Sequence, residues 1–162
     1  MTISVGDRLP EAVVLRSGPQ GPEEVKLSEL TAGRRIILFA VPGAFTPTCH
    51  SAHVPSFVRT KTQFDARGID AIYCIAGNDP FVMKAWGEAT GATAAGIGML
   101  SDPQGEFARS IGMGLDAPAR GLVGRSKRYA MYVEDGVVRV FHPEDSPGNC
   151  EVSGGEAMLA AI

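Results

Sequence analysis

The sequence is poor in cysteine, has no long apolar run and carries no strong excess of charge of either sign. Its three cysteines, Cys49, Cys74 and Cys150, are too few and too widely spaced for the disulfide framework of a small secreted domain. Apolar stretches are interrupted by Pro42 or by glycines well before they reach a membrane-spanning length. We therefore expect a reducing compartment and no membrane association.

The charge balance also excludes some partners. Lysine and arginine total 15 against 18 aspartates and glutamates, a net charge of -3, and no basic cluster stands out. This composition argues against a general nucleic-acid binder. The first residues, 1–7, lack the basic and apolar regions of a signal peptide, so we expect a cytoplasmic protein. The length of 162 residues suits one domain over 1–162 with a sizeable core.

Short apolar segments alternate with helix signals along the chain. Strands are predicted over 13–15, 25–27, 36–41, 70–76 and 99–100, with an exposed turn over 17–22. Helices are predicted from 54 to about 67, from 80 to 87 or 91, over 106–111, and over 154–161 behind a capping box, Ser153 to Glu156. Asp135-Gly136 predicts a hairpin between 129–134 and 137–142. The expected fold class is α/β, with a central mixed sheet and helices on both faces.

The stretch from Pro42 to Cys49 carries the most chemical information. Pro42 and Gly43 end the apolar strand over 36–41, and Thr46-Pro47 then offers a helix N-cap followed by proline at the first helical position. Cys49 is thereby expected in the first helical turn, where backbone N–H groups and the helix dipole stabilise negative charge on sulfur. The alternative is that Cys49 is a buried small hydrophobic residue.

The pattern Pro42-x-x-x-Thr46-x-x-Cys49 resembles the peroxidatic-cysteine motif of peroxiredoxins. The wider string PGAFTPTCHSAHVPSF, from Pro42 to Phe57, is similar to the atypical type-5 (type II) subfamily, and similarity continues through 76–82 and 127–131. This resemblance implies a thioredoxin-like fold and a thiol-dependent peroxidase that reduces hydrogen peroxide and small organic hydroperoxides. It implies no metal and no organic cofactor.

In such a reaction the Cys49 thiolate attacks one peroxide oxygen and becomes a sulfenic acid. A lower thiol pKa raises the thiolate fraction but lowers nucleophilicity, with a Brønsted slope of about 0.4–0.5, so ionisation alone gives little acceleration. Fixed hydrogen-bond donors must supply the rest. The Thr46 hydroxyl is expected to point toward the sulfur, or to act only as an N-cap. Pro42 either shields the sulfur from water or simply ends the strand.

The site also needs a permanent cation, and arginine suits it because its planar fork can donate to sulfur and oxygen together. Arg125, Lys127 and Arg128 lie together, and in a strand Arg128 shares one face with Ala130 and Tyr132. The resemblance selects Arg128, with Arg125 as the alternative. An arginine on a strand would otherwise be expected in solvent.

The reductive half of the cycle is left open by the sequence. The resemblance places Cys150 loosely at the position of a resolving cysteine, which would form a disulfide with Cys49 and be reduced by a thioredoxin. Relatives without such a cysteine use glutathione or glutaredoxin. Cys74 falls in a buried strand and is expected to be a core residue. The resemblance also implies a homodimer formed through loops beside the active site.

These residues also allow other interpretations. Cys49, His50 and His53 could suggest metal ligands, and Cys49 with His142 a cysteine hydrolase, but both lack supporting motifs. The glycine-rich stretch 96–101 is expected to be a turn and not a dinucleotide loop. Cys49 could serve a redox-sensing or chaperone-like protein as a switch, or lie in a catalytically silent interaction domain. Multiple turnover would separate an enzyme from a switch.

Overall fold

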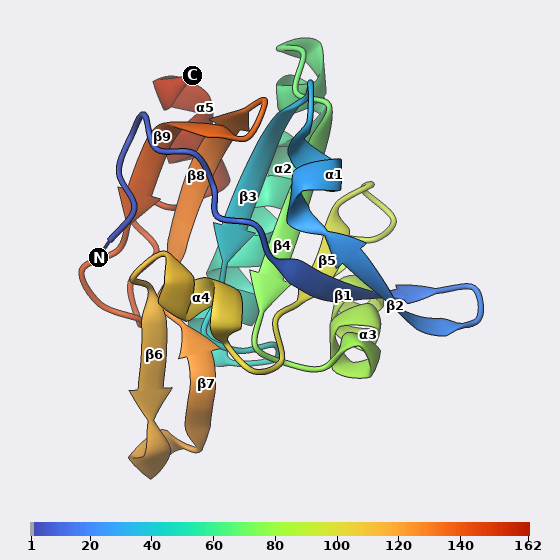
Figure 1. Cartoon of the computed structure of the whole chain (residues 1–162), viewed down its shortest axis with the longest axis vertical. Helices are drawn as coiled ribbons and strands as arrows, with labels where there is room; N and C mark the ends of the chain where they lie inside the picture. The colour runs from blue at the N-terminus through green and yellow to red at the C-terminus, as the bar shows by residue number, and fades with distance from the viewer. Residues whose placement is uncertain (1) are drawn as a thin grey trace.

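A seven-stranded mixed sheet forms the centre of the computed structural model, which describes residues 2–162 (Figure 1). Its strand order is β2-β1-β5-β4-β3-β8-β9, and β3, β4 and β5 run parallel while the other pairs are antiparallel. The strands of this sheet are β1 (Val13–Gly18), β2 (Gly21–Lys26), β3 (Arg35–Ala40), β4 (Ala71–Ala76), β5 (Gly98–Ser101), β8 (Tyr129–Glu134) and β9 (Val137–Pro143). A separate hairpin consists of β6 (Gly114–Ala117) and β7 (Leu122–Ser126).

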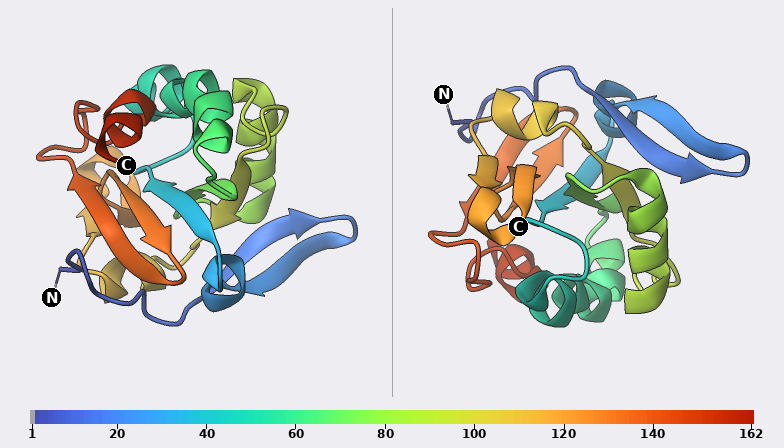
Figure 2. Two further views of the ribbon diagram at one scale, coloured as in Figure 1. Left: turned by 90° about the horizontal axis from the view of Figure 1, so that it is seen from above. Right: turned by 90° about the horizontal axis from the view of Figure 1, so that it is seen from below.

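Helices cover both faces of the sheet, as the sequence predicts (Figure 2). One face carries α2 (Val54–Ala66), α3 (Pro80–Thr90) and α5 (Gly155–Ala161), and the other carries α1 (Leu27–Thr31) and α4 (Glu106–Ser110). A π-helical segment, η1 (Cys49–His53), precedes α2, and a 3-10 turn, η2 (Pro118–Arg120), joins β6 to β7. None of the helices between residues 2 and 162 has the length and apolarity needed to cross a bilayer.

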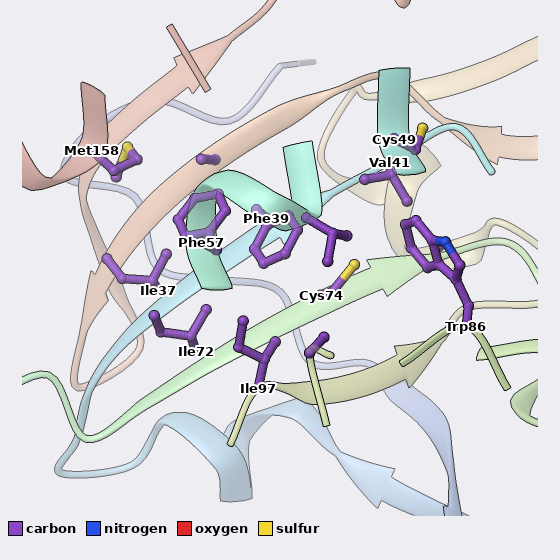
Figure 3. Packing of buried hydrophobic residues seen from close by; sticks show 14 of the residues in the cluster. Ile37, Phe39, Val41, Cys49, Phe57, Ile72, Cys74, Trp86, Ile97 and Met158 are labelled. Carbon is purple, nitrogen blue, oxygen red and sulfur yellow. The ribbon is translucent and has the colours of Figure 1, made fainter. Parts of the chain in front are cut away.

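The central strand β3 organises the core. Its side chains alternate between two clusters, with Ile37 and Phe39 facing α2 and Ile36 and Leu38 facing α1 and α4. Figure 3 shows the first cluster, in which Phe39 packs against Phe57 of α2, with ring centroids 4.1 Å apart. The continuous apolar run is explained by this burial on both faces, which confirms the prediction of a central strand.

The main differences from the predicted elements lie in hairpins. The turn between β1 and β2 is tight, because Gly18 pairs directly with Gly21, and β2 is therefore longer than the predicted 25–27. The β6–β7 hairpin was not predicted, because glycines interrupt its short strands and no alternation of apolar residues marks them. The predicted turn at Asp135-Gly136 is confirmed, with φ angles of 48° and 78°.

The predicted ends of α3 are confirmed, the predicted start of α5 is not, and α1 was not predicted, since its first residue, Leu27, was assigned to a strand. Asp79 caps α3 by accepting a hydrogen bond from the Val82 amide at 2.9 Å, and Gly91 ends it in the left-handed conformation. The capping box predicted for α5 is wrong. Gly154 occupies the N-cap, because the Ser153 hydroxyl donates to Glu144 and Glu156 pairs with Arg59.

Candidate active site

Cys49 lies where the chain passes from the central strand into a helix. After β3 ends at Ala40, residues 41–46 form a loop in which Phe45 has a φ of 62°, and the helical hydrogen bonding begins at Pro47. Cys49 is therefore in the first helical turn, as predicted, and its side chain is fully buried. In Figure 3 it lies at the rim of the core beside Val41. The sulfur of Cys49 therefore lies at the start of a helix and is shielded from water.

The turn that begins at Cys49 is wider than a turn of α-helix. The amide of Val54 donates to the carbonyl of Cys49, five residues earlier. Pro55 follows, and in a regular α-helix its ring would collide with the carbonyl of Ser51 and would offer it no N–H. The wider turn is consistent with relief of that conflict. Short π-helical segments of this kind are frequent at functional sites.

Arg128 reaches Cys49 from the residue before β8. Its Nη2 donates to the sulfur of Cys49 at 2.9 Å, and Nε and Nη2 both donate to the carbonyl of Pro147 at 3.1 Å. The side chain is 2 % exposed. The predicted strand alternation is confirmed, because Ala130 and Tyr132 lie in the same cluster as Cys49. A buried cation is thus held against the sulfur by fixed acceptors.

Arg125, the alternative cation, lies elsewhere. Its Nη1 donates to the carbonyl of Pro42 at 3.1 Å. None of its hydrogen bonds within residues 2–162 reaches the sulfur of Cys49. Arg125 therefore supports the loop that ends β3, whereas Arg128 contacts the candidate nucleophile.

His53 is a site residue that the sequence did not identify in this role. It lies one turn after Cys49, is fully buried, and accepts from Arg128 Nη1 through Nδ1 at 2.8 Å. Its Nε2 lies 2.9 Å from the carbonyl of Ser153 and donates to it, so the proton is on Nε2. Burial, and then the charge of Arg128, lower the pKa of His53 to about 3. The imidazole is consequently neutral and presents a lone pair to the guanidinium. The four-residue spacing from Cys49 is the only sequence signal for this arrangement.

Thr46 is placed beside the site but not as expected. Its hydroxyl donates to the carbonyl of Gly43 at 2.7 Å, and its own carbonyl accepts from the amide of His50. Thr46 therefore holds the predicted N-cap position, with Pro47 as the first helical residue, but its side chain caps no helical amide. Among the hydrogen bonds of the described residues, none joins the Thr46 hydroxyl to Cys49. Thr46 is nevertheless one of the residues that line the pocket beside the site.

A pocket of about 350 Å³ opens above this group. It is lined by two prolines of the strand-to-helix loop, two threonines, two arginines, a leucine and the tip of a C-terminal loop: Pro42, Thr46, Pro47, Thr48, Arg120, Leu122, Arg128, Pro147 and Gly148. The hydroxyl of Thr48 donates to the carbonyl of Gly148 at 3.0 Å. The site is therefore closed on one side by the loop that leads to Cys150.

That C-terminal loop is fastened by one carboxylate. Glu144 Oε2 accepts hydrogen bonds from the amides of Glu151, Val152 and Ser153, at 2.9, 2.9 and 2.7 Å, and from the Ser153 hydroxyl at 2.6 Å. Burial alone would raise the pKa of Glu144, but these hydrogen bonds together lower it. Cys150 lies inside the fastened segment.

All three cysteines are free thiols. Cys150 is half-buried, and burial raises the pKa of its thiol. Cys74, on β4, is fully buried, and burial raises the pKa of its thiol well above the usual value. Figure 3 shows Cys74 deeper in the core than Cys49. The prediction that Cys74 is a core residue is confirmed.

The other ligand sets are not assembled. His50 accepts through Nδ1 from Trp86 Nε1 at 3.0 Å, and no cluster of three histidine, cysteine or carboxylate side chains suited to a metal is found among the described residues. Nδ1 of His142 lies 2.8 Å from the carbonyl of Val152, in contact with the C-terminal loop and not with Cys49. The stretch 96–101, expected to be a turn, is a turn only at its start: Gly96 ends a turn, whereas Gly98–Ser101 forms β5, in line with the separate strand prediction over 99–100.

Comparison with known proteins gives a consistent result. Residues 4–159 match the family described as Redoxin. The chain is 45% identical over 165 residues to "Peroxiredoxin-2E-2, chloroplastic" of Oryza sativa subsp. japonica. The aligned region covers 99% of this chain and 73% of that protein.

Solved structures agree in fold. Reduced Prx3 from Vibrio vulnificus in complex with H2O2 matches with a TM-score of 0.92 and 42% identity, over 99% of both chains. Peroxiredoxin 5 from Alvinella pompejana matches with a TM-score of 0.84 and 36% identity, over 98% of this chain and 97% of that one. These neighbours share the thioredoxin-like arrangement described above.

Proposed function

The chain belongs to the redoxin family and within it to the type-5-like peroxiredoxins, so it is a thiol-dependent peroxidase, and we propose that Cys49 is the sulfur that attacks the peroxide. One observation carries this assignment. The Nη2 group of Arg128 donates to the sulfur of Cys49 at 2.9 Å inside a water-excluding core. A charge-assisted donor at that distance stabilises a thiolate and the charge that moves onto oxygen.

In the proposed step, the Cys49 thiolate attacks one oxygen of the peroxide and the O–O bond breaks. A sulfur–oxygen bond forms, leaving Cys49 as a sulfenic acid, and the other oxygen leaves as hydroxide or alkoxide and takes up a proton. Arg128 stabilises the negative charge along this path. Thr46 and Pro42 both line the pocket, and in this proposal the Pro42 ring, which has no N–H, shields the sulfur from water.

His53 acts in this proposal as a positioning residue. Its Nδ1 lone pair fixes Nη1 of Arg128, while the carbonyl of Pro147 fixes Nε, so the remaining Nη2 is directed at Cys49. A preorganised donor costs no reorganisation when charge develops during the reaction. We therefore include His53 in the functional site.

Cys150 is our proposed resolving cysteine. Its thiol would attack the sulfur of the Cys49 sulfenic acid, forming a disulfide and releasing water, and a thioredoxin would then reduce the disulfide. In support, two contacts hold the loop that leads to Cys150 beside the site: Thr48, next to Cys49 on its helix, donates to Gly148, and Arg128, which contacts the sulfur of Cys49, donates to Pro147. Glutathione or glutaredoxin would serve instead if the sulfenic acid persisted.

We further propose a homodimer and a cytoplasmic location. Phe45 and Phe81 are 53% and 66% exposed. Phe45 lies in the loop beside the pocket, and Phe81 lies on α3, the helix whose Trp86 ring is 6.4 Å from that of Phe45. Covering such side chains favours association. Sedimentation of Phe81→Glu should show a shift toward monomer. The three cysteines are too few and too widely spaced for the disulfide framework of a secreted domain, which favours a reducing compartment.

The function is tested by peroxide consumption with a thiol reductant. Cys49→Ser should abolish turnover, and the matched Cys74→Ser variant, which removes a thiol outside the site, should keep it. Many equivalents of peroxide consumed per chain would identify an enzyme, whereas a single equivalent would identify a redox switch. Retained turnover in Cys49→Ser would overturn the assignment.

Intact-mass and peptide analysis after one equivalent of peroxide tests the second half of the cycle. Loss of two hydrogens with Cys49 linked to Cys150 is expected. A Cys49 sulfenic acid that persists until glutathione is added would instead establish a one-cysteine cycle.

A further inference from the structure

The pocket above Cys49 is larger than hydrogen peroxide requires. Its volume of about 350 Å³ lies at the lower end of the range for small-molecule sites, about 300–1,000 Å³. At ~30 Å³ per water, it has room for roughly a dozen water molecules. A molecule with only two oxygens would fill a small part of it. The pocket therefore has space for an organic portion of the reacting molecule.

The lining combines polar and apolar side chains. Arg128, which also contacts the sulfur of Cys49, and Thr46 are polar, and Leu122 with the prolines at 42, 47 and 147 provides apolar wall. Such a wall favours a hydrocarbon portion by removing it from water. Arg120 adds a second cation to the same lining.

Arg120 comes from η2, at the tip of the β6–β7 hairpin, which projects beyond the main sheet (Figure 1; Figure 2, right). The residue is exposed, and within residues 2–162 its side chain makes no hydrogen bond or ion pair. Arg128, in contrast, is engaged by Cys49, His53 and Pro147. The pocket thus contains one cation engaged with the sulfur and a second cation free to bind a ligand.

We propose that Arg120 binds the carboxylate of a small organic molecule whose reactive end reaches Cys49, an inference that rests on the peroxidase function proposed above. The molecule has an anionic end for Arg120, an apolar portion for the wall that includes Leu122, and a reactive end for the part of the pocket that Arg128 lines. A carboxylate is ionised at neutral pH and matches the planar fork of arginine. Two sources have this chemistry: a carboxylate-bearing organic hydroperoxide, and glutathione acting as reductant.

The oxidative half-reaction is tested with a matched pair of substrates, cumene hydroperoxide and its para-carboxylate. The measured quantity is the ratio of the second-order rate constants for the charged and the neutral hydroperoxide. Arg120→Gln should lower this ratio by about fivefold, the size expected for one exposed ion pair. Arg120→Glu should lower it further, Arg120→Lys should restore part of it, and added salt should reduce the wild-type ratio.

Lys127→Gln is the matched control, because it removes an exposed cation one residue from Arg128 that does not line the pocket. Lys127→Gln should leave the ratio of rate constants unchanged if Arg120 acts by direct contact with the carboxylate. A change in the ratio would mean that the net charge of the protein surface produces the preference.

The reductive half-reaction is tested by comparing glutathione with its diethyl ester as reductants of the oxidised enzyme. If Arg120→Gln slows reduction by glutathione but not by its diethyl ester, the carboxylate that Arg120 binds belongs to the reductant. If Arg120→Gln slows only the reaction with the charged hydroperoxide, the carboxylate belongs to the substrate. Equal rates for charged and neutral partners in the wild type, or equal losses in Arg120→Gln and Lys127→Gln, would overturn the proposal. Loss of hydrogen peroxide turnover by the wild type would instead contradict the peroxidase function itself.

Discussion

His53 and Arg128 meet in the core through a contact of 2.8 Å between the Nδ1 atom of the imidazole and the Nη1 atom of the guanidinium. Because arginine is always a donor, the histidine must accept, and it can do so only when neutral. The same imidazole donates from Nε2 to the carbonyl of Ser153. One neutral ring therefore links the cation beside Cys49 to the start of the last helix.

The first prediction concerns the rate of Cys49 oxidation. His53→Phe removes the acceptor for Arg128 and should lower the rate constant for peroxide by roughly tenfold or more, since an unsatisfied buried donor costs about 1–3 kcal/mol. His53→Gln offers an amide oxygen to Arg128 and should recover part of the rate. Stopped-flow fluorescence of Trp86 or product assays would measure it. His50→Gln is the control, because His50 bonds to Trp86 and not to Arg128. Equal rates in His53→Phe and wild type would contradict a positioning role.

The second prediction is a pH dependence of stability. The pKa of His53 is about 3 in the folded protein and about 6.5 in the unfolded chain, so below pH 6.5 the unfolded state binds one more proton. Unfolding is therefore favoured as the pH falls, by up to about 1.4 kcal/mol per unit between pH 6.5 and 3. Urea unfolding of wild type and His53→Gln at pH 4.5 to 7 would measure the difference. An identical pH slope in the two proteins would show that His53 is not buried in its neutral form.

The third prediction concerns the loop that contains Cys150. Glu144→Gln should lower the free energy of unfolding by about 1 kcal/mol, because hydrogen bonds to a charged group contribute about 1.5–3 kcal/mol and those to a neutral group about 0.5–1.5 kcal/mol. Amide exchange at residues 151–153 and alkylation of Cys150 should both become faster, because the neutral oxygen of glutamine is a weaker acceptor for these amides than the carboxylate. Glu151→Gln leaves the backbone contact intact and serves as the control. Unchanged exchange in Glu144→Gln would mean that the carboxylate does not hold the loop.

The fourth prediction concerns Cys74. Because burial raises the pKa of its thiol, Cys74 should resist alkylation until the protein unfolds, while the half-buried Cys150 should react in the native state. Cys74→Ala should reduce stability by about 1 kcal/mol and leave turnover intact. Mass analysis of labelled peptides along a urea series would follow both thiols. A Cys49–Cys74 disulfide after peroxide treatment would contradict this assignment.

Local patterns in the sequence were enough to predict the central strand, the helix after it and the position of Cys49 between them. Each of these predictions depended on neighbouring residues alone. The apolar run predicts the strand β3, Pro42 predicts its end, and Asp135-Gly136 predicts a hairpin turn. Arg128 required more, because only the resemblance distinguished it from Arg125. The alternation of side chains along β8 is consistent with that choice, because Ala130 and Tyr132, on the same face as Arg128, lie in the cluster that contains Cys49.

The remaining contacts join distant segments, and for that reason no local pattern predicted them. Glu144 binds amides seven to nine residues away, and His53 depends on residues 75 and 100 positions later. Thr46 has the residue type of an N-cap, but the nearby carbonyl of Gly43 takes its hydroxyl. Residue preference describes what a side chain can do, whereas tertiary neighbours decide which bond it makes.

The pairing of β3 with β8 also has a consequence during synthesis. Cys49 is translated 79 residues before Arg128, and the strand that delivers the arginine docks only after those residues have left the ribosome. At about 5–20 residues per second, the nascent chain carries this cysteine without its cation for on the order of ten seconds. During that interval the thiol lacks the donor that would activate it. The reactive sulfur is thus produced by completion of the sheet, and not by the segment that contains it.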